Sequence, residues 1–125
     1  MTAKKILVAD DQESIRRGLR QMLDDAGDLY IGGEAADGAE ALKKVRQEPW
    51  DLVILDVTMP NGNGLDVLRE IRGEYPSLPV LMLSVHPASQ YSARAMRLGA
   101  SGYIVKDHAP EELLPKIREV LAVRG

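Results

Sequence analysis

The stretch from Asp51 to Pro60, with the sequence DLVILDVTMP, constrains the fold more than any other part of the chain. Its four consecutive apolar residues, Leu52 to Leu55, are too few for a helix and too continuous for a half-exposed strand. This pattern predicts a strand that is buried on both faces, as in a parallel sheet covered by helices. Asp56 follows directly, at the edge where open α/β folds bind their ligands. We therefore expect a functional site at this edge.

Apolar runs of strand length alternate with helical periodicities along the rest of the chain. Further strands are predicted at residues 6–9, 29–35, 80–83 and 103–105. The apolar positions of the predicted helices are Ile15, Leu19, Met22, Leu23 and Ala26; Ala41, Leu42 and Val45; Leu65, Leu68 and Ile71; Tyr91, Ala95, Met96 and Leu98; and Leu113, Leu114, Ile117, Val120 and Leu121. Five strands alternating with five helices predict one α/β domain over residues 1–125, with a parallel sheet covered on both faces.

Glycine and proline mark where several of these elements end. Gly27 lies at the expected end of the first helix, Asp37 and Gly38 predict a turn, and residues 60–64, PNGNG, predict a loop. Pro115 falls in the interior of the last predicted helix, where proline costs about 3 kcal/mol. We therefore predict either a bend or a late start for that helix.

Composition excludes several classes of protein. The net charge of −3, from 16 Lys and Arg against 19 Asp and Glu, disfavours nucleic-acid binding by this domain itself. The absence of cysteine excludes disulfides and thiolate metal sites, and agrees with a cytoplasmic location. No apolar run approaches the roughly 20 residues of a membrane span, and the first one stops at two aspartates, so neither a span nor a signal peptide is predicted.

Polar side chains follow four of the five predicted strands. Asp10 and Asp11 follow the first strand, Asp56 the third, Ser84 the fourth and Lys106 the fifth. Because the carboxyl ends of parallel strands lie at one edge of a doubly wound sheet, we expect these side chains to converge there.

Three neighbouring carboxylates imply a cation, because they are ionised at neutral pH and repel one another. Ligands that are all oxygen favour a hard ion such as Mg²⁺. A lysine and a hydroxyl facing that ion suit phosphoryl transfer, in which catalysis is mostly positioning and charge neutralisation. Asp56 is the candidate nucleophile, because Asp10 and Asp11 are better placed to bind metal from the side.

Taken singly, these residues have ordinary structural explanations. Asp11 could cap the first helix, Ser84 could be a turn hydroxyl, and Lys106 could be a solvated surface residue. Tyr103, in the fifth strand, could serve packing alone. One site explains their coincidence at the strand ends, whereas the ordinary explanations must apply independently at each position.

The motifs that contain these residues resemble the receiver domain of two-component response regulators. They are VADDQ, LDVTMPNGNG, LMLSV and GASGYIVKD, and the resemblance covers essentially the whole chain. It implies a flavodoxin-like, three-layer (βα)5 fold with the strand order 2-1-3-4-5.

The resemblance also implies a phosphorylation site and a metal site. Asp56 is similar to the phosphoacceptor, which takes a phosphoryl group from a phosphohistidine on a sensor histidine kinase. Asp11, Asp56 and the main-chain carbonyl of Thr58 match the Mg²⁺ ligands, and Asp10 would reach the ion through water.

Other positions match residues that contact the phosphoryl group or respond to it. Lys106 would pair with the phosphoryl oxygens, and Ser84 would bond to one of them. Tyr103 matches the switch aromatic that turns inward when the hydroxyl residue moves. Thr58 and His86 occupy variable positions of the family that tune the rate at which water removes the phosphoryl group.

The resemblance implies a signalling switch that catalyses only its own phosphorylation and dephosphorylation. Asp107 follows Lys106 at a position where many receivers have proline. The sequence GYIVKD with PEELL downstream is common in receivers that are followed by a helix-turn-helix DNA-binding domain. No such output domain is expected within this chain, so any contact with DNA would be made by a domain outside it. The chain is expected to be either a fragment of a longer regulator or a stand-alone regulator. The family's dimer face, made by the fourth helix, fifth strand and fifth helix, is the expected homodimer surface.

Two other functions are alternatives to the switch. A Mg²⁺-dependent phosphatase of the haloacid dehalogenase type also uses an aspartate after a buried strand, but requires a second aspartate where this chain has Thr58. A flavodoxin-like flavin carrier would need an aromatic clamp and a hydroxyl-rich phosphate loop, and neither follows the first strand.

Overall fold

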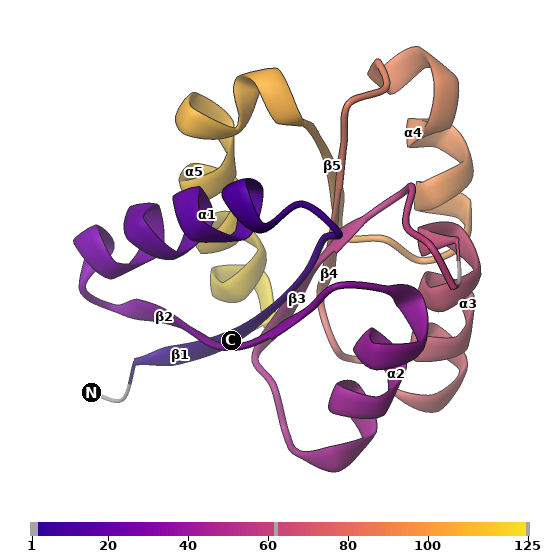
Figure 1. Cartoon of the computed structure of the whole chain (residues 1–125), viewed down its shortest axis with the longest axis horizontal. Helices are drawn as coiled ribbons and strands as arrows, with labels where there is room; N and C mark the ends of the chain where they lie inside the picture. Colours follow the sequence, from indigo (N-terminus) through magenta and orange to yellow (C-terminus); the bar gives the residue numbers. More distant parts are fainter. Residues whose placement is uncertain (1–2, 62, 125) are drawn as a thin grey trace.

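Five parallel strands form one sheet through the centre of the molecule (Figure 1). The computed structural model describes residues 3–61 and 63–124. The strands are β1 (Lys4–Ala9), β2 (Leu29–Ala35), β3 (Leu52–Asp56), β4 (Val80–Ser84) and β5 (Gly102–Val105). They lie in the order β2-β1-β3-β4-β5, which confirms the order 2-1-3-4-5. The sheet therefore places the ends of β1 and β3 side by side.

Five helices cover the two faces of this sheet (Figure 1). α1 (Glu13–Ala26) and α5 (Ala109–Arg124) pack on one face, and α2 (Gly38–Gln47), α3 (Gly64–Glu74) and α4 (Ala88–Arg97) pack on the other. A short 3₁₀ helix, η1 (Lys106–His108), joins β5 to α5. None of the described helices is both long and apolar enough to cross a membrane.

β3 is buried along its whole length, as its continuous apolar run predicts. Its side chains alternate between two separate cores because successive residues of a strand point to opposite faces. Val53 and Leu55 pack with α2, α3 and α4, whereas Leu52 and Ile54 pack with α1 and α5. Burial of a large aliphatic side chain stabilises the fold by about 1.5–3 kcal/mol. The strand that carries Asp56 is therefore rigidly anchored from both sides.

Two of the predicted turn segments begin helices instead. Asp37 caps α2, and its side chain accepts a hydrogen bond of 2.8 Å from the Glu40 N–H, so Gly38 is the first helical residue. Asn63 caps α3 in the same way, through a 2.7 Å bond from the Leu65 N–H. Short polar side chains satisfy the unpaired N–H groups of a helix start, which explains why a turn signal marks these boundaries.

The predicted loop at residues 60–64 is confirmed only in part. Asn61 adopts a left-handed conformation with φ of 52°, as expected of a tight connection. Gly62 lies outside the described residues, and Gly64 belongs to α3.

The predicted apolar stripe of α4 is wrong at Met96, which is 48% exposed. Tyr91, Ala95 and Leu98, at helical spacing, contact the core, with Ala95 fully buried. Successive helical residues are rotated by about 100°, so Met96 points away from the face that Ala95 occupies.

The last helix begins at Ala109 and continues through Pro115, so the predicted late start is wrong. Pro110 lies in the first turn, as predicted, where its missing N–H needs no partner. Pro115 is exposed, and the buried side of the helix is formed by Leu113 and Ile117. Packing of that side offsets the cost of the proline. A bend at Pro115 stays a prediction.

Replacing Pro115 by alanine restores a donor that can bond to the carbonyl four residues earlier. We expect Pro115→Ala to raise the free energy of unfolding by about 1–2 kcal/mol, less than the full helix-interior cost because proline also restricts the unfolded chain. Urea unfolding of the two proteins measures this difference in the free energy of unfolding. Pro110→Ala is the matched control and should change stability by less than about 0.5 kcal/mol. An unchanged or less stable Pro115→Ala protein would contradict this account.

Candidate functional site

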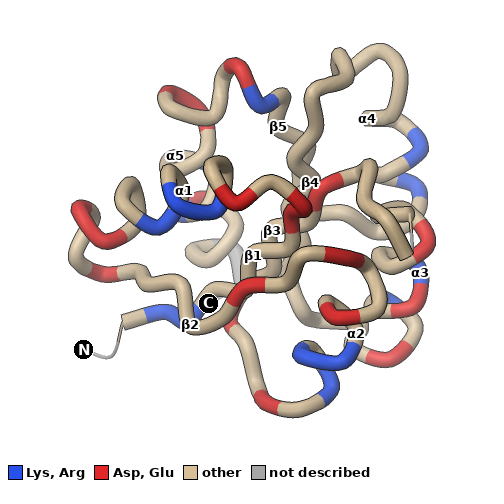
Figure 2. Tube along the Cα trace, in the orientation of Figure 1, with Lys and Arg blue, Asp and Glu red and all other residues tan. Residues whose placement is uncertain are grey.

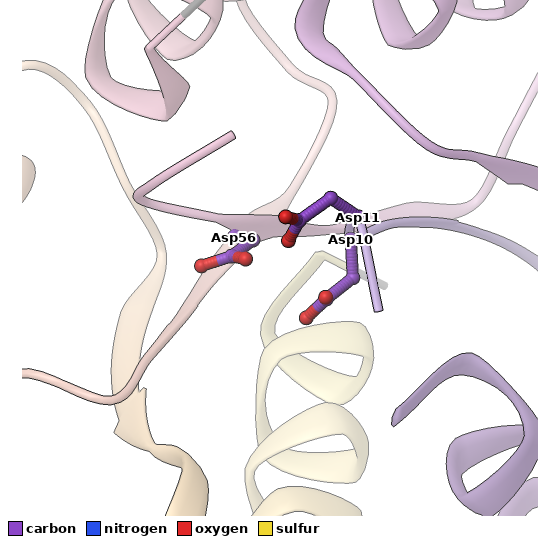
Figure 3. A group of neighbouring side chains, drawn as sticks. All are labelled: Asp10, Asp11 and Asp56. Atoms are coloured by element: carbon purple, nitrogen blue, oxygen red, sulfur yellow. The ribbon is translucent and has the colours of Figure 1, made fainter. Parts of the chain in front are cut away.

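Three aspartates from two neighbouring strands meet at the carboxyl edge of the sheet. Asp10 and Asp11 follow β1, and Asp56 ends β3, which pairs with β1 through Ala9 and Leu55. Carboxylate oxygens of the three aspartates lie within 4.8 Å of one another. Figure 3 shows the three side chains as neighbours at this edge, and Figure 2 shows acidic segments meeting where β1 and β3 end. We call this group, Asp10, Asp11 and Asp56, the acidic pocket.

Asp10 and Asp11 differ in how firmly they are held. Asp10 is fully buried; its N–H donates to the Ala35 carbonyl at 2.9 Å, and its Oδ1 accepts from the Gln12 N–H at 2.8 Å. The Asp11 side chain is exposed and, among the described residues, has no hydrogen-bond or ion-pair partner. The N-cap of α1 is Gln12, so Asp11 does not cap the helix. Its carboxylate is available to a ligand.

Lys106 brings a positive charge to the pocket from the start of η1. Its Nζ lies 2.8 Å from Asp10 Oδ2 and 3.3 Å from Asp56 Oδ2, and donates to Gln12 Oε1 at 3.3 Å. Burial opposes the ammonium charge, but the contact with Asp10 and the charges of Asp56 and Asp10 outweigh it, so the pKa of Lys106 is raised. The lysine therefore stays charged and partly neutralises two buried acids.

Asp56 has a raised pKa. Burial raises its pKa to about 6, the nearby charge of Asp10 adds to this increase, and Lys106 opposes it. The Thr58 N–H donates to its Oδ1 at 3.2 Å. At neutral pH Asp56 is mostly ionised, but its charge is costly and is not fully compensated by Lys106.

A close approach between α3 and the end of β3 sets the position of the Asp56 main chain. The Gly64 N–H donates to the Val57 carbonyl at 2.8 Å. A Cβ added at Gly64 would lie 2.0 Å from the Asp56 carbonyl oxygen, which no side chain can accommodate. Glycine at this position thus lets the helix start against the strand that carries Asp56.

A second group of residues links the loops after β3 and β4. Ser84 is fully buried, and its Oγ accepts from the His86 N–H at 3.0 Å. The half-buried Tyr103 donates its hydroxyl to the His86 carbonyl at 3.1 Å, and burial raises the pKa of that hydroxyl. His86 Nε2 lies 3.3 Å from Thr58 Oγ1, and the His86 ring contacts Tyr91 edge-on. His86 therefore connects the pocket loop to Ser84 and Tyr103.

The acidic pocket fits a hard divalent cation. Its donors are carboxylate oxygens, with no histidine or cysteine among them. The buried Asp10 Oδ2 receives no hydrogen bond, its contact with Lys106 being an ion pair only, and the Asp11 carboxylate has spare lone pairs. Oxygen donors in excess of the available positive charge are the environment that Mg²⁺ prefers.

Comparison with known proteins points to one family. A family model described as the response regulator receiver domain matches residues 6–118. The chain is 36% identical over 115 residues to "Response regulator UvrY" of Escherichia coli, covering 92% of this chain and 53% of that protein. It is 37% identical over 121 residues to "DNA-binding transcriptional activator DevR/DosR" of Mycobacterium tuberculosis, covering 97% and 56%. The chain thus spans about half the length of the curated relatives it matches.

The fold is also similar to solved structures of this kind. The crystal structure of a two-component response regulator of the LuxR family, from an Aurantimonas species, superposes with a TM-score of 0.92 at 32% identity. The match covers 98% of this chain and 88% of that chain. Nothing in these similarities favours the phosphatase or the flavin carrier.

The raised pKa of Asp56 makes stability depend on pH. Its folded pKa of about 6 lies above its ordinary value of 3.8. Ionisation of Asp56 therefore lowers the free energy of unfolding as pH rises from about 4 to about 6. Without divalent cations, Asp56→Asn should therefore raise the free energy of unfolding at about pH 7.5 by on the order of 2 kcal/mol. The gain should shrink as pH falls through about 6 and vanish near 4.

Urea unfolding in the presence of a chelator, repeated across this pH range, measures the effect. Asp24→Asn, an exposed change at the far end of α1, is the control for removing one negative charge. A gain that is independent of pH, or equal in the control, would contradict the assignment of the penalty to Asp56.

Proposed function

This chain belongs to the response regulator receiver domains of two-component systems, and we propose that it acts as a signalling switch phosphorylated on Asp56. The convergence of Asp10, Asp11, Asp56 and Lys106 at one edge of the sheet supports this proposal most directly. A phosphohistidine of a sensor histidine kinase would be the donor. The domain would promote only its own phosphorylation and dephosphorylation and would act on no other substrate.

Asp56 would be the nucleophile. One of its carboxylate oxygens attacks phosphorus while the bond from phosphorus to the donor imidazole breaks, and the imidazole nitrogen keeps the bonding electron pair. The Lys106 ammonium lies 3.3 Å from Asp56 Oδ2, where it can pair with a phosphoryl oxygen. The Ser84 oxygen now accepts a hydrogen bond, so its own proton remains to be donated to the phosphoryl group.

Mg²⁺ would occupy the acidic pocket. Asp11, Asp56 and the Thr58 carbonyl would hold it directly and Asp10 through water. When bound, it would neutralise charge on the pocket and on the phosphoryl oxygens.

Phosphorylation would then reposition Ser84 and Tyr103. Both contact the main chain of His86, through its N–H and its carbonyl respectively. If the Ser84 side chain rotates so that its Oγ moves toward the phosphoryl oxygen, its bond from the His86 N–H is lost, and the loop and Tyr103 can move together. The phosphoryl group carries about −1.5 to −2 charges in place of the single negative charge of the Asp56 carboxylate, and this change in charge and size would drive the movement.

The switch would control transcription through a second domain. Relatives such as the DNA-binding transcriptional activator DevR/DosR support a helix-turn-helix output domain as the DNA-binding part, and this chain covers 56% of the length of that protein. Residues 1–125 would be the receiver, acting in the cytoplasm. The active form would pair through the face made by α4, β5 and α5.

Labelling with a small phosphodonor tests the proposed site. With Mg²⁺ and acetyl phosphate, intact mass should show one added phosphoryl group per chain, because one nucleophile is present. Asp56→Asn and addition of a chelator should each abolish the label, and Asp24→Asn should retain it. Full labelling of Asp56→Asn would show that another residue is the acceptor.

The same preparation separates the switch from the phosphatase. Incubation with phosphomonoesters should release no more than one phosphate per chain. Sustained turnover would contradict the switch.

Thr58 and His86 would set the lifetime of the phosphoryl group. Their side chains meet at 3.3 Å, joining the loops on either side of Asp56. A bridge in this position restricts the approach of water to the phosphoryl group.

Removing the bridge should accelerate hydrolysis. We expect Thr58→Ala and His86→Ala each to raise the dephosphorylation rate several-fold, and the double variant to add little, because either change breaks the same contact. Decay of the labelled mass after removal of the donor measures the rates. Effects of the two changes that simply multiply would contradict a shared bridge.

A further inference from the structure

We propose that Arg16 is a positioning residue, which sets the cation affinity of the acidic pocket by fixing the main chain between Asp10 and Asp11. This inference rests on the proposed function, because it concerns how the Mg²⁺ site is held. Arg16 lies in the second turn of α1. No contact between its side chain and the three pocket carboxylates is recorded in the described structure.

The Arg16 guanidinium joins the pocket to the neighbouring strand. Its Nη1 donates to the Asp10 carbonyl oxygen at 2.6 Å, and its Nε donates to Glu34 Oε1 at 2.8 Å. The Arg16 side chain is only 16% exposed. A planar guanidinium that makes both bonds has little freedom, so the carbonyl is held in one orientation.

Glu34, at the end of β2, is itself firmly held. Its other carboxylate oxygen accepts from Arg20, and its main-chain carbonyl accepts from Lys44. The hydrogen bond from Arg20, together with that from Arg16, lowers the pKa of Glu34. Glu34 is therefore a fixed, ionised anchor for Arg16. The next residue, Ala35, accepts the Asp10 N–H at 2.9 Å.

These contacts matter most for Asp11. The peptide bond is planar, so fixing the Asp10 carbonyl also fixes the direction in which the chain enters Asp11. Asp10 has further restraints at both carboxylate oxygens, from Gln12 and Lys106. The Asp11 carboxylate has none among the described residues, so its aim depends on its main chain. Arg16 orients that segment from the Asp10 carbonyl, together with the Asp10 carboxylate that accepts the Gln12 N–H.

The adjacent Arg17 provides a matched control. Its side chain is 74% exposed and, within the described part of the chain, pairs only with Glu13, one turn earlier. Arg17→Ala removes the same charge from the same helix without touching the pocket or Glu34. Arg16→Lys keeps the charge but cannot bridge both partners.

Calorimetric titration with Mg²⁺ tests the inference, at a temperature well below each variant's unfolding midpoint. Because outer contacts of a metal site typically affect affinity by 10- to 100-fold, we expect Arg16→Ala to raise the Mg²⁺ Kd about tenfold or more. Arg17→Ala should leave the Kd within about twofold of the parent protein, and Arg16→Lys should fall between the two. At saturating Mg²⁺, acetyl phosphate labelling of Arg16→Ala should largely recover.

A merely structural role would lower the unfolding midpoint of Arg16→Ala but leave its Mg²⁺ Kd equal to that of Arg17→Ala, which would overturn the inference. If Arg16→Ala does not fold, Glu34→Gln decides: it keeps an acceptor for Arg16 but loses the charge. An increase of about threefold or more in its Kd supports the inference, and an unchanged Kd overturns it. If the parent protein binds no Mg²⁺ and takes no label, the proposed function itself fails.

Discussion

The ion contacts of Lys106 with two buried acids are the interaction on which the site depends. Asp10 and Asp56 are almost completely buried, and two uncompensated carboxylates this close would oppose folding. The ammonium lies within 3.3 Å of both and ties the ends of β1, β3 and β5 together. One positive charge does not balance three acids, and burial together with the charge of Asp10 raises the pKa of Asp56 to about 6 despite Lys106. The folded domain is thus poised to take up further positive charge.

Most of the fold could be predicted from the sequence, because each element has a clear local pattern. The fully apolar run of β3 and the spacing of apolar residues in α1 and α5 identified buried strands and amphipathic helices. Errors arose where tertiary contacts override local preference. Pro115 is tolerated because the opposite side of α5 is packed, and Gly64 joins α3 because that helix starts against the Asp56 carbonyl.

The site was predictable as far as the topology governs it. Strand ends at one edge bring Asp10, Asp11, Asp56 and Lys106 together whatever the loops do. The contacts around them were not predictable, since they depend on how each helix is rotated. Arg16 and Arg17 both lie off the apolar stripe of α1, yet only Arg16 faces β2.

The sheet divides the interior into two cores, and this division affects how such a domain can change during evolution. Next to the pocket, Met82 and Leu83 are neighbours in β4 but belong to different cores. Either helical layer can accordingly accumulate substitutions without disturbing the packing of the other. One chemical trigger can thereby be coupled to unrelated effectors during divergence, with the reactive edge kept and a single layer remodelled.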